Sequence, residues 1–579
     1  MPWTSHDPTG RDGTIQQLRL ELTMDPQAQA ARALELFHAG QFQESLELAQ
    51  PLVQLPGMVG EMSHLEGACL HQLGRSAEAV APVRRAIAAD PANASYLNTL
   101  GVILRKIKHT EQAVRAYERV IALDPGFADA YYNCGNALSE LKRLEEAAEK
   151  FRGCLQHNPR HNSAHHNLAN SYRDLKQLDL ALEHYRLSDD CEHHNPDMHC
   201  NWGLAWQLKE RWDKAIDAFE TAIAQKSDHA PSHINLGSAL AVQERFDEAC
   251  ASLRRGVELD DTCNDAKFNL GLTLLTIGQY EEGWKFYDTR LSLPDKVRPP
   301  LGSPIWDGSL DIDGPLLVWA EQGYGDNIQF VRYLPILVEL GLQVTCATRG
   351  PLMELFRQCL QPACPAIIEH KPADLQGFRH HVPLLTLPRI LRTTLNTVPM
   401  MPGYLKAPAA IPDRLRVARQ PFALHIGLVW ASGVDNKDMY ADKSLALELL
   451  MPLFDQWRQE RLVTLHALQV GVDAAQLDPW RGEWGVTDWS DRLTSFLDTA
   501  IVINQLDLVI TVDTAVAHVA GGLDKPTWLL LQHNADFRWL RGRADSPWYP
   551  CMSLFRQRKL GDWPSAVAQL GERLTQLLG

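Results

Sequence analysis

The sequence predicts an α + α/β protein, in which an array of paired helices precedes a region of parallel strands and covering helices. Small residues recur every 34 residues between Gly67 and Gly271, which is typical of a two-helix repeat stacked on copies of itself. After Pro315, short apolar runs alternate with helical segments, which favours an α/β fold. We expect a flexible N-terminus at 1–22, a superhelical array of about eight repeats at 23–297, a linker at 298–314, and two α/β halves at 315–415 and 416–579.

The composition excludes several classes of protein. The 579 residues include 71 acidic and 56 basic side chains, giving a net charge of −15, and they contain no basic block. We therefore exclude a nucleic-acid surface. The 11 cysteines form no CxxC pair, which is typical of a reducing compartment. The N-terminus is too polar for a signal peptide, and no run approaches 18 apolar residues. We therefore expect a cytoplasmic protein without a membrane span.

Three sets of positions keep the 34-residue step. One set is small: Gly67, Gly101, Gly135, Ala169, Gly203, Gly237 and Gly271. A second set is also small: Ala79, Ala113, Ala147, Ala181, Ala215, Ala249 and Gly283. A third set is bulky: Val83, Tyr117, Phe151, Tyr185, Phe219, Leu253 and Tyr287. Small residues let two antiparallel helices approach closely, and the bulky residue fills the space against the next repeat. The pattern resembles the tetratricopeptide repeat over roughly half of the chain.

An asparagine series runs in register with the repeats, two residues before each position of the first small set. Its members are Asn133, Asn167, Asn201, Asn235 and Asn269. On the first helix of each pair they should line the concave face, where paired donors and acceptors can hold an extended peptide by its backbone. We therefore predict that this series binds a protein acceptor. The alternative is that these asparagines serve packing between repeats.

Histidine is concentrated in two stretches, at 157–166 and 193–200. A zinc site would need ligands at a metal-binding spacing, and no such spacing repeats in these stretches. We therefore expect solvated histidines in the turns between repeats, and we predict no metal site.

The second half alternates strands with helices. We expect strands at 316–320, 343–347, 367–369, 381–385, 425–430, 462–465, 508–512 and 527–531. We expect helices over 327–340, from 351, from 444, over 515–520 with Gly521–Gly522 as its stop, and from about 563 to 578. The pair Asp311 and Asp313 precedes the first strand, so we interpret it as a turn and not as a metal-binding pair. Two small Rossmann-like halves facing one cleft are the simplest arrangement.

The segment 506–531 is a compact strand–helix–strand unit. Asp513 follows an apolar strand, and open α/β sheets bind ligands at the carboxyl ends of their strands. Thr514 should cap the following helix and leave its first amides free to hold a phosphate. His518 lies four residues further along, on the same side of the helix. The alternative is a capped helix that only packs in the core.

Four stretches resemble one family of enzymes. They are EQGYGDNIQFVRYLP at 321–335, HIGLVWASG at 425–433, DKS at 442–444, and DTAIVINQLDLVITVDTAVAHVAGGLDKPTW at 498–528. Together they are similar to the heptosyltransferase-like glycosyltransferases of family 9, which have the GT-B fold of two Rossmann-like halves. The tail at 538–557 resembles a subgroup in which this domain follows tetratricopeptide repeats. The whole plan resembles bacterial flagellin-modifying protein O-glycosyltransferases.

The resemblance implies roles for individual residues. Asp326 matches a proposed general base, which would accept a proton from the acceptor hydroxyl; the alternative is that it only caps the helix from Asn327. Lys443 matches a basic residue that meets the donor phosphate. Asp513 matches a residue against the donor sugar. His518 matches a residue near the same phosphate, where a protonated imidazole would neutralise the leaving nucleotide.

The predicted site therefore has two groups of residues. Asp326 and His518 are the predicted catalytic residues. The predicted donor-binding residues are Gly323, Gly325, Ser432, Lys443, Ser444, Asp513, Thr514, Ala515 and His518. Because helix amides, Lys443 and His518 can share the phosphate charge, we expect no metal and no cofactor besides the nucleotide-sugar co-substrate.

These observations and the resemblance lead to the hypothesis of a cytoplasmic protein O-glycosyltransferase whose repeats capture the acceptor. The resemblance implies transfer with inversion. It also makes flagellin the first candidate acceptor and a CMP-linked nonulosonic acid such as pseudaminic acid the first candidate donor, with ADP- and UDP-sugars left open. One alternative is a lipopolysaccharide or glycolipid glycosyltransferase. The other is a non-catalytic repeat scaffold with a lapsed transferase domain.

Overall fold

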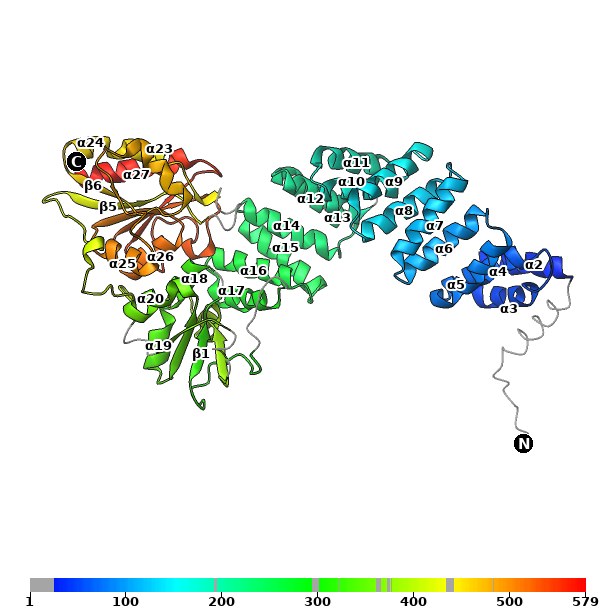
Figure 1. The fold of residues 1–579 in the computed structure, drawn as a ribbon, viewed down its shortest axis with the longest axis horizontal. Coiled ribbons are helices and arrows are strands. Elements are labelled where there is room, and N and C mark those ends of the chain that lie inside the picture. Colours follow the sequence, from blue (N-terminus) through cyan, green and yellow to red (C-terminus); the bar gives the residue numbers. More distant parts are fainter. Residues whose placement is uncertain are drawn as a thin grey trace, which may run out of the picture. The chain divides into compact units, whose positions relative to one another are not determined.

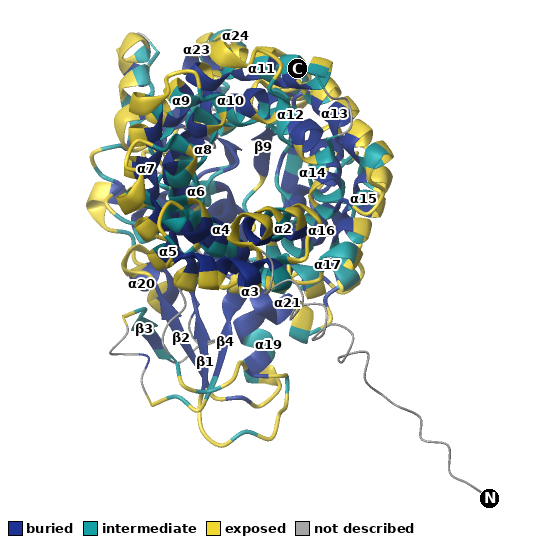
Figure 2. Cartoon of the chain, turned by 90° about the vertical axis from the view of Figure 1, so that its right-hand side faces the viewer, coloured by how far each residue is buried: buried dark blue, intermediate teal, exposed yellow. Residues whose placement is uncertain are grey.

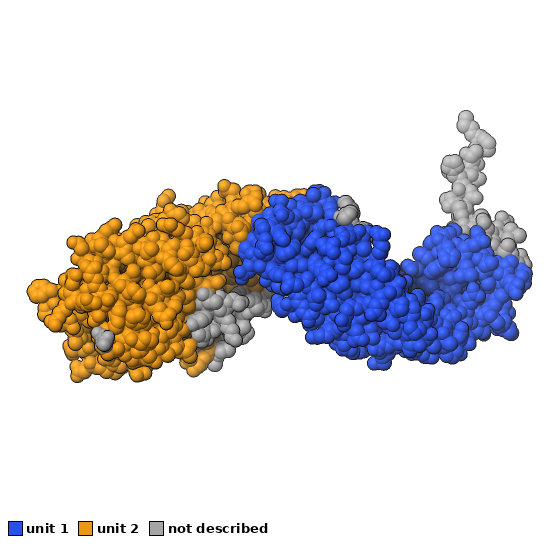
Figure 3. All heavy atoms as spheres, turned by 90° about the horizontal axis from the view of Figure 1, so that it is seen from above, with its two compact units in different colours: residues 1–239 blue, residues 240–579 orange. Residues whose placement is uncertain are grey.

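The computed structural model describes residues 25–191, 195–293, 301–321, 323–360, 366–371, 375, 377–433, 442–482 and 484–579. The chain divides into two compact units, Met1–Ala239 (unit 1) and Leu240–Gly579 (unit 2), which Figure 3 shows in different colours. The division falls inside helix α14 (Ala230–Val242), whereas the repeat pattern of the sequence continues to about residue 297. Unit 2 therefore combines the last helices of the array with all of the strands.

Sixteen helices in the described residues form eight consecutive pairs, as the sequence predicts (Figure 1). The first helices of the pairs are α2 (Pro26–His38), α4 (Val59–Gln72), α6 (Ala94–Lys106), α8 (Ala128–Glu140), α10 (Asn162–Asp174), α12 (Pro196–Leu208), α14 and α16 (Asn264–Thr276). The second helices are α3 (Phe42–Leu52), α5 (Ser76–Ala89), α7 (Thr110–Leu123), α9 (Leu144–His157), α11 (Leu178–Cys191), α13 (Trp212–Gln225), α15 (Phe246–Leu259) and α17 (Tyr280–Tyr287).

The packing inside a pair explains the small and bulky positions of the repeat. A Cβ atom placed on Gly101 would lie 2.5 Å from Cε1 of Tyr117, and one placed on Gly135 would lie 2.6 Å from Cε1 of Phe151. Tyr117 and Phe151 are fully buried. The bulky side chain of the second helix therefore rests directly on the glycine of the first helix, and a side chain added at Gly101 or Gly135 would have to displace that ring.

The first α/β half of unit 2 has a four-stranded parallel sheet in the order β3-β2-β1-β4. Its strands are β1 (Leu316–Trp319), β2 (Val344–Thr348), β3 (Ala366–Glu369) and β4 (His380–Pro383), and its main helices are α18 (Tyr324–Phe330), α19 (Tyr333–Glu339) and α20 (Gly350–Cys359). Strands β1 and β2 are buried along their whole length (Figure 2), as expected for parallel strands that are covered on both faces.

The single helix expected over 327–340 is instead two short helices, α18 and α19. Pro335 accounts for the break, because it has no N–H group to bond to the carbonyl of Val331. The break turns the side chain of Arg332 into the interior, where it is fully buried. Its guanidinium donates hydrogen bonds to the carbonyls of Gln329 (2.8 Å) and Trp548 (2.5 Å).

The second α/β half has a six-stranded parallel sheet in the order β10-β9-β8-β5-β6-β7. Alternate residues of β8 enter two separate core clusters, Val509 on one face and Ile510 on the other. The strands are β5 (Leu424–Val429), β6 (Val463–Ala467), β7 (Thr487–Asp488), β8 (Leu508–Val512), β9 (Thr527–Leu531) and β10 (Met552–Arg556), and the helices include α25 (Phe496–Asn504), α26 (Ala515–Gly522) and α27 (Trp563–Leu578). The predicted α + α/β class is confirmed.

Two expectations about helix ends in this half are wrong. Ser444 does not start a helix; α23 begins at Leu447 (Leu447–Leu450), because the Ser444 hydroxyl accepts a hydrogen bond from the backbone N–H of Ser432 (3.0 Å) and holds the chain in a loop. Gly521 and Gly522 do not stop α26 but form its last residues. A Cβ atom on Gly521 would lie 2.4 Å from the Tyr549 ring, so the glycine permits close packing.

The last helices of the array pack into the α/β core within unit 2. Trp284 of α17 is 1% exposed, and its ring contacts Phe330 of the first half at 6.1 Å and Phe537 of the second half at 5.6 Å between centroids. Arg290, in the 3-10 helix η1 (Asp288–Ser292), forms ion pairs with Asp288 (2.6 Å) and Glu321 (2.7 Å). These contacts explain why unit 2 begins before the repeat pattern ends.

Other expectations can be placed on the structure. Asp313 pairs with Arg379 and with His380 (2.9 Å), and residues 311–313 lie outside the helices and strands. Among the described helices, none combines the length and the apolar character that a bilayer span requires.

Candidate functional site

The topology of the second sheet gathers several strand ends at one edge. Strand β8 lies between β5 and β9, and β10 lies beyond β9. All of these strands are parallel, so their carboxyl ends share one edge. This edge therefore collects the residues that follow the strands: Ser432 after β5, Asp513 and Thr514 after β8, His533 after β9 and Gln557 after β10.

A buried ion pair joins Asp513 to Lys443. Lys443 Nζ lies 2.7 Å from Asp513 Oδ2, and Asp513 is 5% exposed. Burial alone would raise the pKa of Asp513, but the positive charges of Lys443 and Arg538 lower that pKa to about 2. The pair is therefore fully ionised at neutral pH, and it places a cation beside the start of α26.

The start of α26 has the geometry that the sequence predicts. The Thr514 side chain accepts a hydrogen bond from the N–H of Val516 (3.2 Å), which confirms Thr514 as the N-cap, and Ala515 is the first helical residue. The positive end of the helix dipole and the Lys443 ammonium group thus adjoin each other. Both features favour an anion such as a phosphate group.

Asp326 comes from the other half and forms an ion pair with Arg538. Arg538 is 6% exposed, and it also pairs with Asp536 at 3.1 Å. Burial raises the pKa of Asp326, and the Arg538 charge opposes this effect without abolishing it. A carboxylate whose pKa is raised is a better proton acceptor near neutral pH. The Asp326 side chain can take this position because residue 323 is a glycine. A Cβ atom on Gly323 would lie 2.5 Å from Asp326 Oδ2.

His518 is buried between the two halves. It is 3% exposed, its Nδ1 atom lies 2.8 Å from the Tyr549 hydroxyl, and its ring stacks on Trp539 at 5.4 Å. Burial and then the positive charge of Arg538 lower the pKa of His518 to about 3. The imidazole is therefore neutral at neutral pH, which contradicts the protonated imidazole expected from the sequence. The physical reason is that a buried site with cations on the same side disfavours a further positive charge.

Gly325 links His518 to the first half. A Cβ atom on Gly325 would lie 2.7 Å from Cδ2 and 3.1 Å from Nε2 of His518. Helix α18, which carries Gly325, therefore packs directly on α26, and a side chain at 325 would separate them.

The structure thus brings together the predicted donor-site residues of both halves and adds one that sequence reasoning missed. Arg538 contacts Asp326 directly, yet no role was predicted for it. The available signal was its place in the RWLRGRADSPWYP tail, which resembles a specific subgroup. The chemical roles of all these residues stay predictions.

The asparagine series lies on the first helices of its pairs, with every member half-buried. In unit 1 each of these side-chain amides makes a hydrogen bond to a residue of the preceding repeat. The pairs are Asn133–Asn98 (3.3 Å), Asn167–Asn136 (2.7 Å), Asn201–His166 (3.2 Å) and Asn235–Cys200 (3.4 Å). The packing alternative therefore has direct support, and peptide binding by the series stays a prediction.

The histidines of the two rich stretches are not all solvated turn residues, as the sequence led us to expect. His165 and His199 are 6% and 5% exposed on first helices of the array. His165 Nδ1 lies 2.9 Å from Nδ1 of His184, and His199 Nε2 lies 3.2 Å from Asp189. His193 and His194 lie outside the described residues. Within the described ranges, no group of three or more His, Cys, Asp or Glu side chains is arranged to hold a metal ion.

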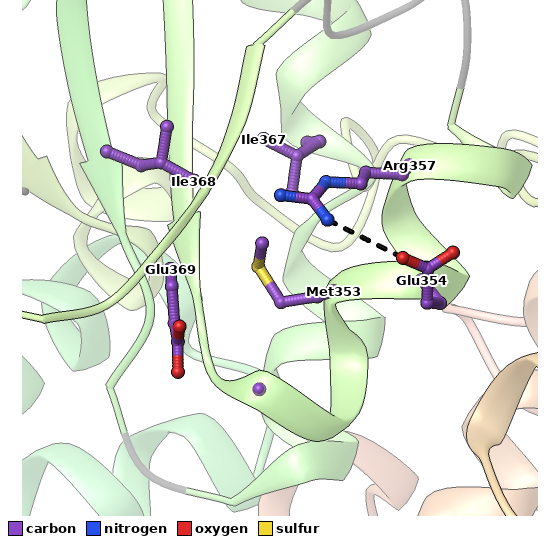
Figure 4. A pocket seen from close by; sticks show the side chains of 7 residues that line it. Met353, Glu354, Arg357, Ile367, Ile368 and Glu369 are labelled. Atoms are coloured by element: carbon purple, nitrogen blue, oxygen red, sulfur yellow. Dashed lines mark hydrogen bonds and ion pairs between the residues drawn. The ribbon is translucent and has the colours of Figure 1, made fainter.

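A hollow of about 690 Å³ lies elsewhere on the first half, beside helix α20 and the edge strand β3 (Figure 4). Its lining residues are Gly350, Met353, Glu354, Arg357, Ile367, Ile368 and Glu369. None of them belongs to the predicted donor site, so this hollow is separate from the cluster around Asp513.

Comparison with known families identifies the repeats. Models described as "TPR repeat" and "Tetratricopeptide repeat" match residues 103–142, and residues 30–94, 128–161 and 209–262, respectively. The chain therefore contains tetratricopeptide repeats. One curated relative is "Protein FlbA" of Caulobacter vibrioides, which is 26% identical over 333 residues. The match covers 52% of this chain and 53% of the relative, so the chain spans about half the length of that protein.

Several solved structures are similar to part of the chain. YrrB, described as a TPR protein with an unusual peptide-binding site, is 21% identical, with 32% of this chain and 95% of that chain covered and a TM-score of 0.29. PilF of Pseudomonas aeruginosa is 20% identical, the match covers 36% of this chain and 94% of that chain, and the TM-score is 0.33. The C-terminal part of a TPR protein from Cytophaga hutchinsonii is 15% identical, with 42% and 99% covered and a TM-score of 0.36.

Proposed function

We propose that the chain is an inverting protein O-glycosyltransferase that uses a nucleotide sugar. One observation carries this proposal: Asp326 of the first α/β half is ion-paired with Arg538 of the second half, beside the Lys443–Asp513 pair and the start of α26. A proton acceptor from one half therefore adjoins the anion-binding elements of the other. Sugar transfer from a phosphate leaving group to a hydroxyl group needs this combination.

The proposed step uses these residues as follows. The phosphate of the donor binds at the first amides of α26. When it binds, the Lys443 ammonium group leaves its ion pair with Asp513 and pairs with a phosphate oxygen instead. The acceptor hydroxyl attacks the anomeric carbon from the side opposite the nucleotide while Asp326 accepts its proton. The bond from the anomeric carbon to the phosphate oxygen breaks with its electron pair on the phosphate. Lys443, Arg538 and the helix amides stabilise that charge without a metal ion, and the configuration at the anomeric carbon inverts.

The acceptor is proposed to be a protein bound by the tetratricopeptide repeats, in a cytoplasmic setting. Stacked repeats of this kind form extended surfaces suited to protein partners. Flagellin is the first acceptor to test, and a CMP-linked nonulosonic acid is the first donor, ahead of ADP- and UDP-sugars. Two rival functions make different predictions. A glycolipid glycosyltransferase would transfer the sugar to a lipid acceptor, and a non-catalytic scaffold would bind no nucleotide.

Calorimetric titration of the full chain with CMP, UDP and ADP tests the nucleotide site. We expect one of the three to bind, and we expect Asp326→Asn to retain that binding because Asp326 is assigned to the acceptor proton. Asp311→Asn, at an exposed carboxylate before β1, is the matched control. If none of the nucleotides binds the wild-type chain, the proposal fails and the scaffold alternative gains support.

A further inference from the structure

The turns inside the repeats share a backbone feature that continues into unit 2. One residue in each turn has a positive φ angle, and for Glu210 and Glu244 this angle is 56° and 59°. The full series, spaced by 34 residues, is Gly40, Gly74, Lys108, Lys142, Lys176, Glu210, Glu244 and Gly278. The backbone of the turn is therefore constant, while the side chain at this position varies.

Glu244 departs from the other members of the series in its surroundings. It lies between α14 and α15, and its Oε1 atom is 3.2 Å from Nε of Arg541 and 3.7 Å from Nε2 of His533. Both partners follow strand β9 of the second sheet. By contrast, Glu210 is exposed. A carboxylate from a repeat turn thus reaches the carboxyl edge of the sheet that holds the candidate site, entirely within unit 2.

The partners of Glu244 belong to residues 532–545, which we call the site segment because it carries Asp536 and Arg538. Arg541 donates a hydrogen bond to the carbonyl of His533 (2.6 Å), which closes the segment on itself. Arg556 of β10 donates to the carbonyl of Leu540 (2.9 Å). Burial lowers the pKa of Arg541, and the charge of Glu244 opposes that effect. Glu244, together with the more weakly acting Asp536, therefore supplies counter-charge to this half-buried guanidinium.

We infer that Glu244 is a positioning residue of the nucleotide-sugar site. The ion pair of Glu244 with Arg541 restrains the site segment. The site segment in turn carries Arg538 and keeps it in its ion pair with Asp326. The turn between α14 and α15 thus contributes to the donor site although it belongs to the repeat array. The inference rests on the proposed function for the nature of the ligand, whereas the bracing of the site segment by Glu244 stands on geometry alone.

Hydrogen–deuterium exchange on the full chain tests the bracing directly. Glu244→Gln removes the charge but keeps the size of the side chain, and we expect amides of 536–541 to exchange about two- to fivefold faster, which is the range that a partly exposed ion pair supports. Glu210→Gln is the matched control, since it makes the same change at the equivalent exposed turn, and it should leave these amides unchanged. In the Arg541→Ala background, Glu244→Gln should have a smaller effect than in the wild type, because only the contact of Glu244 with His533 is left to lose.

Calorimetry with CMP, UDP and ADP tests the link to the donor. Glu244→Gln should lower the affinity for the nucleotide that binds the wild-type chain by about two- to fivefold, in proportion to the increase in exchange rate. Glu210→Gln should leave this affinity unchanged. Unchanged exchange in Glu244→Gln would overturn the bracing. Faster exchange with unchanged nucleotide affinity would overturn the positioning role. Faster exchange in a chain that binds none of the nucleotides would support the bracing and overturn the proposed function instead.

Discussion

Arg538 joins the two α/β halves of unit 2 through its ion pair with Asp326. The two residues are 212 positions apart in the chain, and each comes from the carboxyl side of a different parallel sheet. Arg538 is almost completely buried, whereas the side chain of Asp326 is 23% exposed, so only the arginine end of the pair is shielded from water. This contact places the candidate general base beside the candidate phosphate site, and it provides the first test of the arrangement.

Removing Arg538 should destabilise unit 2. Arg538→Met leaves Asp326 and Asp536 without their shared cation. Both carboxylates are partly exposed, so we expect a loss of about 1.5–3 kcal/mol, the range of a hydrogen bond to a charged group. Urea unfolding followed by tryptophan fluorescence should show a lower midpoint for unit 2. The double variant Arg538→Met with Asp326→Asn should recover part of the loss. A midpoint equal to that of the wild type would contradict a stabilising role for the Arg538–Asp326 pair.

Lys443 should determine nucleotide affinity. Lys443→Gln removes the cation that is proposed to meet the phosphate, and a charge-assisted contact of this kind is worth about 1.5–3 kcal/mol, which is roughly 10- to 150-fold in affinity. Calorimetry with the nucleotide that binds the wild-type chain gives the measurement. Lys559→Gln, at an exposed lysine after β10, should bind normally. Equal affinity in both variants would remove Lys443 from the donor site.

The contact of Gly325 with His518 predicts a steric effect. In Gly325→Ala the new Cβ atom would lie 2.7 Å from the imidazole, so α18 and α26 must move apart at a cost of about 1–3 kcal/mol. Thermal unfolding should show a lower transition temperature for unit 2. Gly302→Ala is the control, because nothing lies within 4 Å of a Cβ atom at that position. Equal effects of the two changes would refute the close packing.

Acid should destabilise the middle of the repeat array. Burial lowers the pKa of His166 to about 4, and burial together with His165 lowers the pKa of His184 to about 4, both from 6.5. The unfolded chain therefore binds more protons than the folded chain between these values. The stabilising contribution is complete above pH 6.5 and falls as the pH drops towards 4, by about 1–2 kcal/mol per histidine at pH 5.

Circular dichroism melts of the full chain at pH 7.5 and pH 5 would measure this dependence. His184→Gln should make the helical transition less sensitive to pH than in the wild type. His38→Gln, at a histidine near the end of α2 whose side chain is not buried, should leave the sensitivity unchanged. Identical pH dependence in all three proteins would contradict a role for the half-buried His166 and His184.

The boundary of unit 2 predicts which truncations fold. A fragment that begins at residue 310 lacks Trp284 and Arg290, and it leaves Glu321 and Thr386 without their buried partner. We expect this fragment to be aggregated or unfolded. A fragment that begins at residue 227, before α14, keeps these contacts and should give a cooperative melt with dispersed amide resonances. A well-folded fragment from residue 310 would refute this account of the junction.

Local patterns made much of the fold predictable. The 34-residue step predicted the helix pairs because each pair repeats the same small–bulky contact, as Gly135 and Phe151 show. Strands β8 and β9 begin and end where their apolar runs begin and end, since buried parallel strands are apolar on both faces. Helix α27 has the bounds 563–578 that the sequence predicts. Thr514 was recognisable as an N-cap because its hydrogen bond is local.

The rest depends on contacts between distant segments. Nothing near Asp326 in the sequence indicates Arg538, because their meeting requires both sheets to be in place. The neutrality of His518 follows from its burial against Tyr549 and Trp539, which a helical spacing does not reveal. The role of Gly521 as a packing residue depends on the same Tyr549 ring. The asparagine side chains of unit 1 contact residues 35 positions earlier in the chain. These partners belong to the preceding repeat, and only the stacking of the repeats reveals them.

Intact-mass analysis of a candidate acceptor tests the central proposal most directly. Flagellin should be co-expressed with the wild-type chain, with Asp326→Asn, and with the Asp311→Asn control, together with the enzymes that supply the nucleotide sugar. We predict that flagellin gains the mass of one or more sugar residues with the wild type and with Asp311→Asn, and none with Asp326→Asn. Sugar addition that persists with Asp326→Asn would contradict Asp326 as the base, and an unchanged mass with the wild type would contradict flagellin glycosylation by this chain.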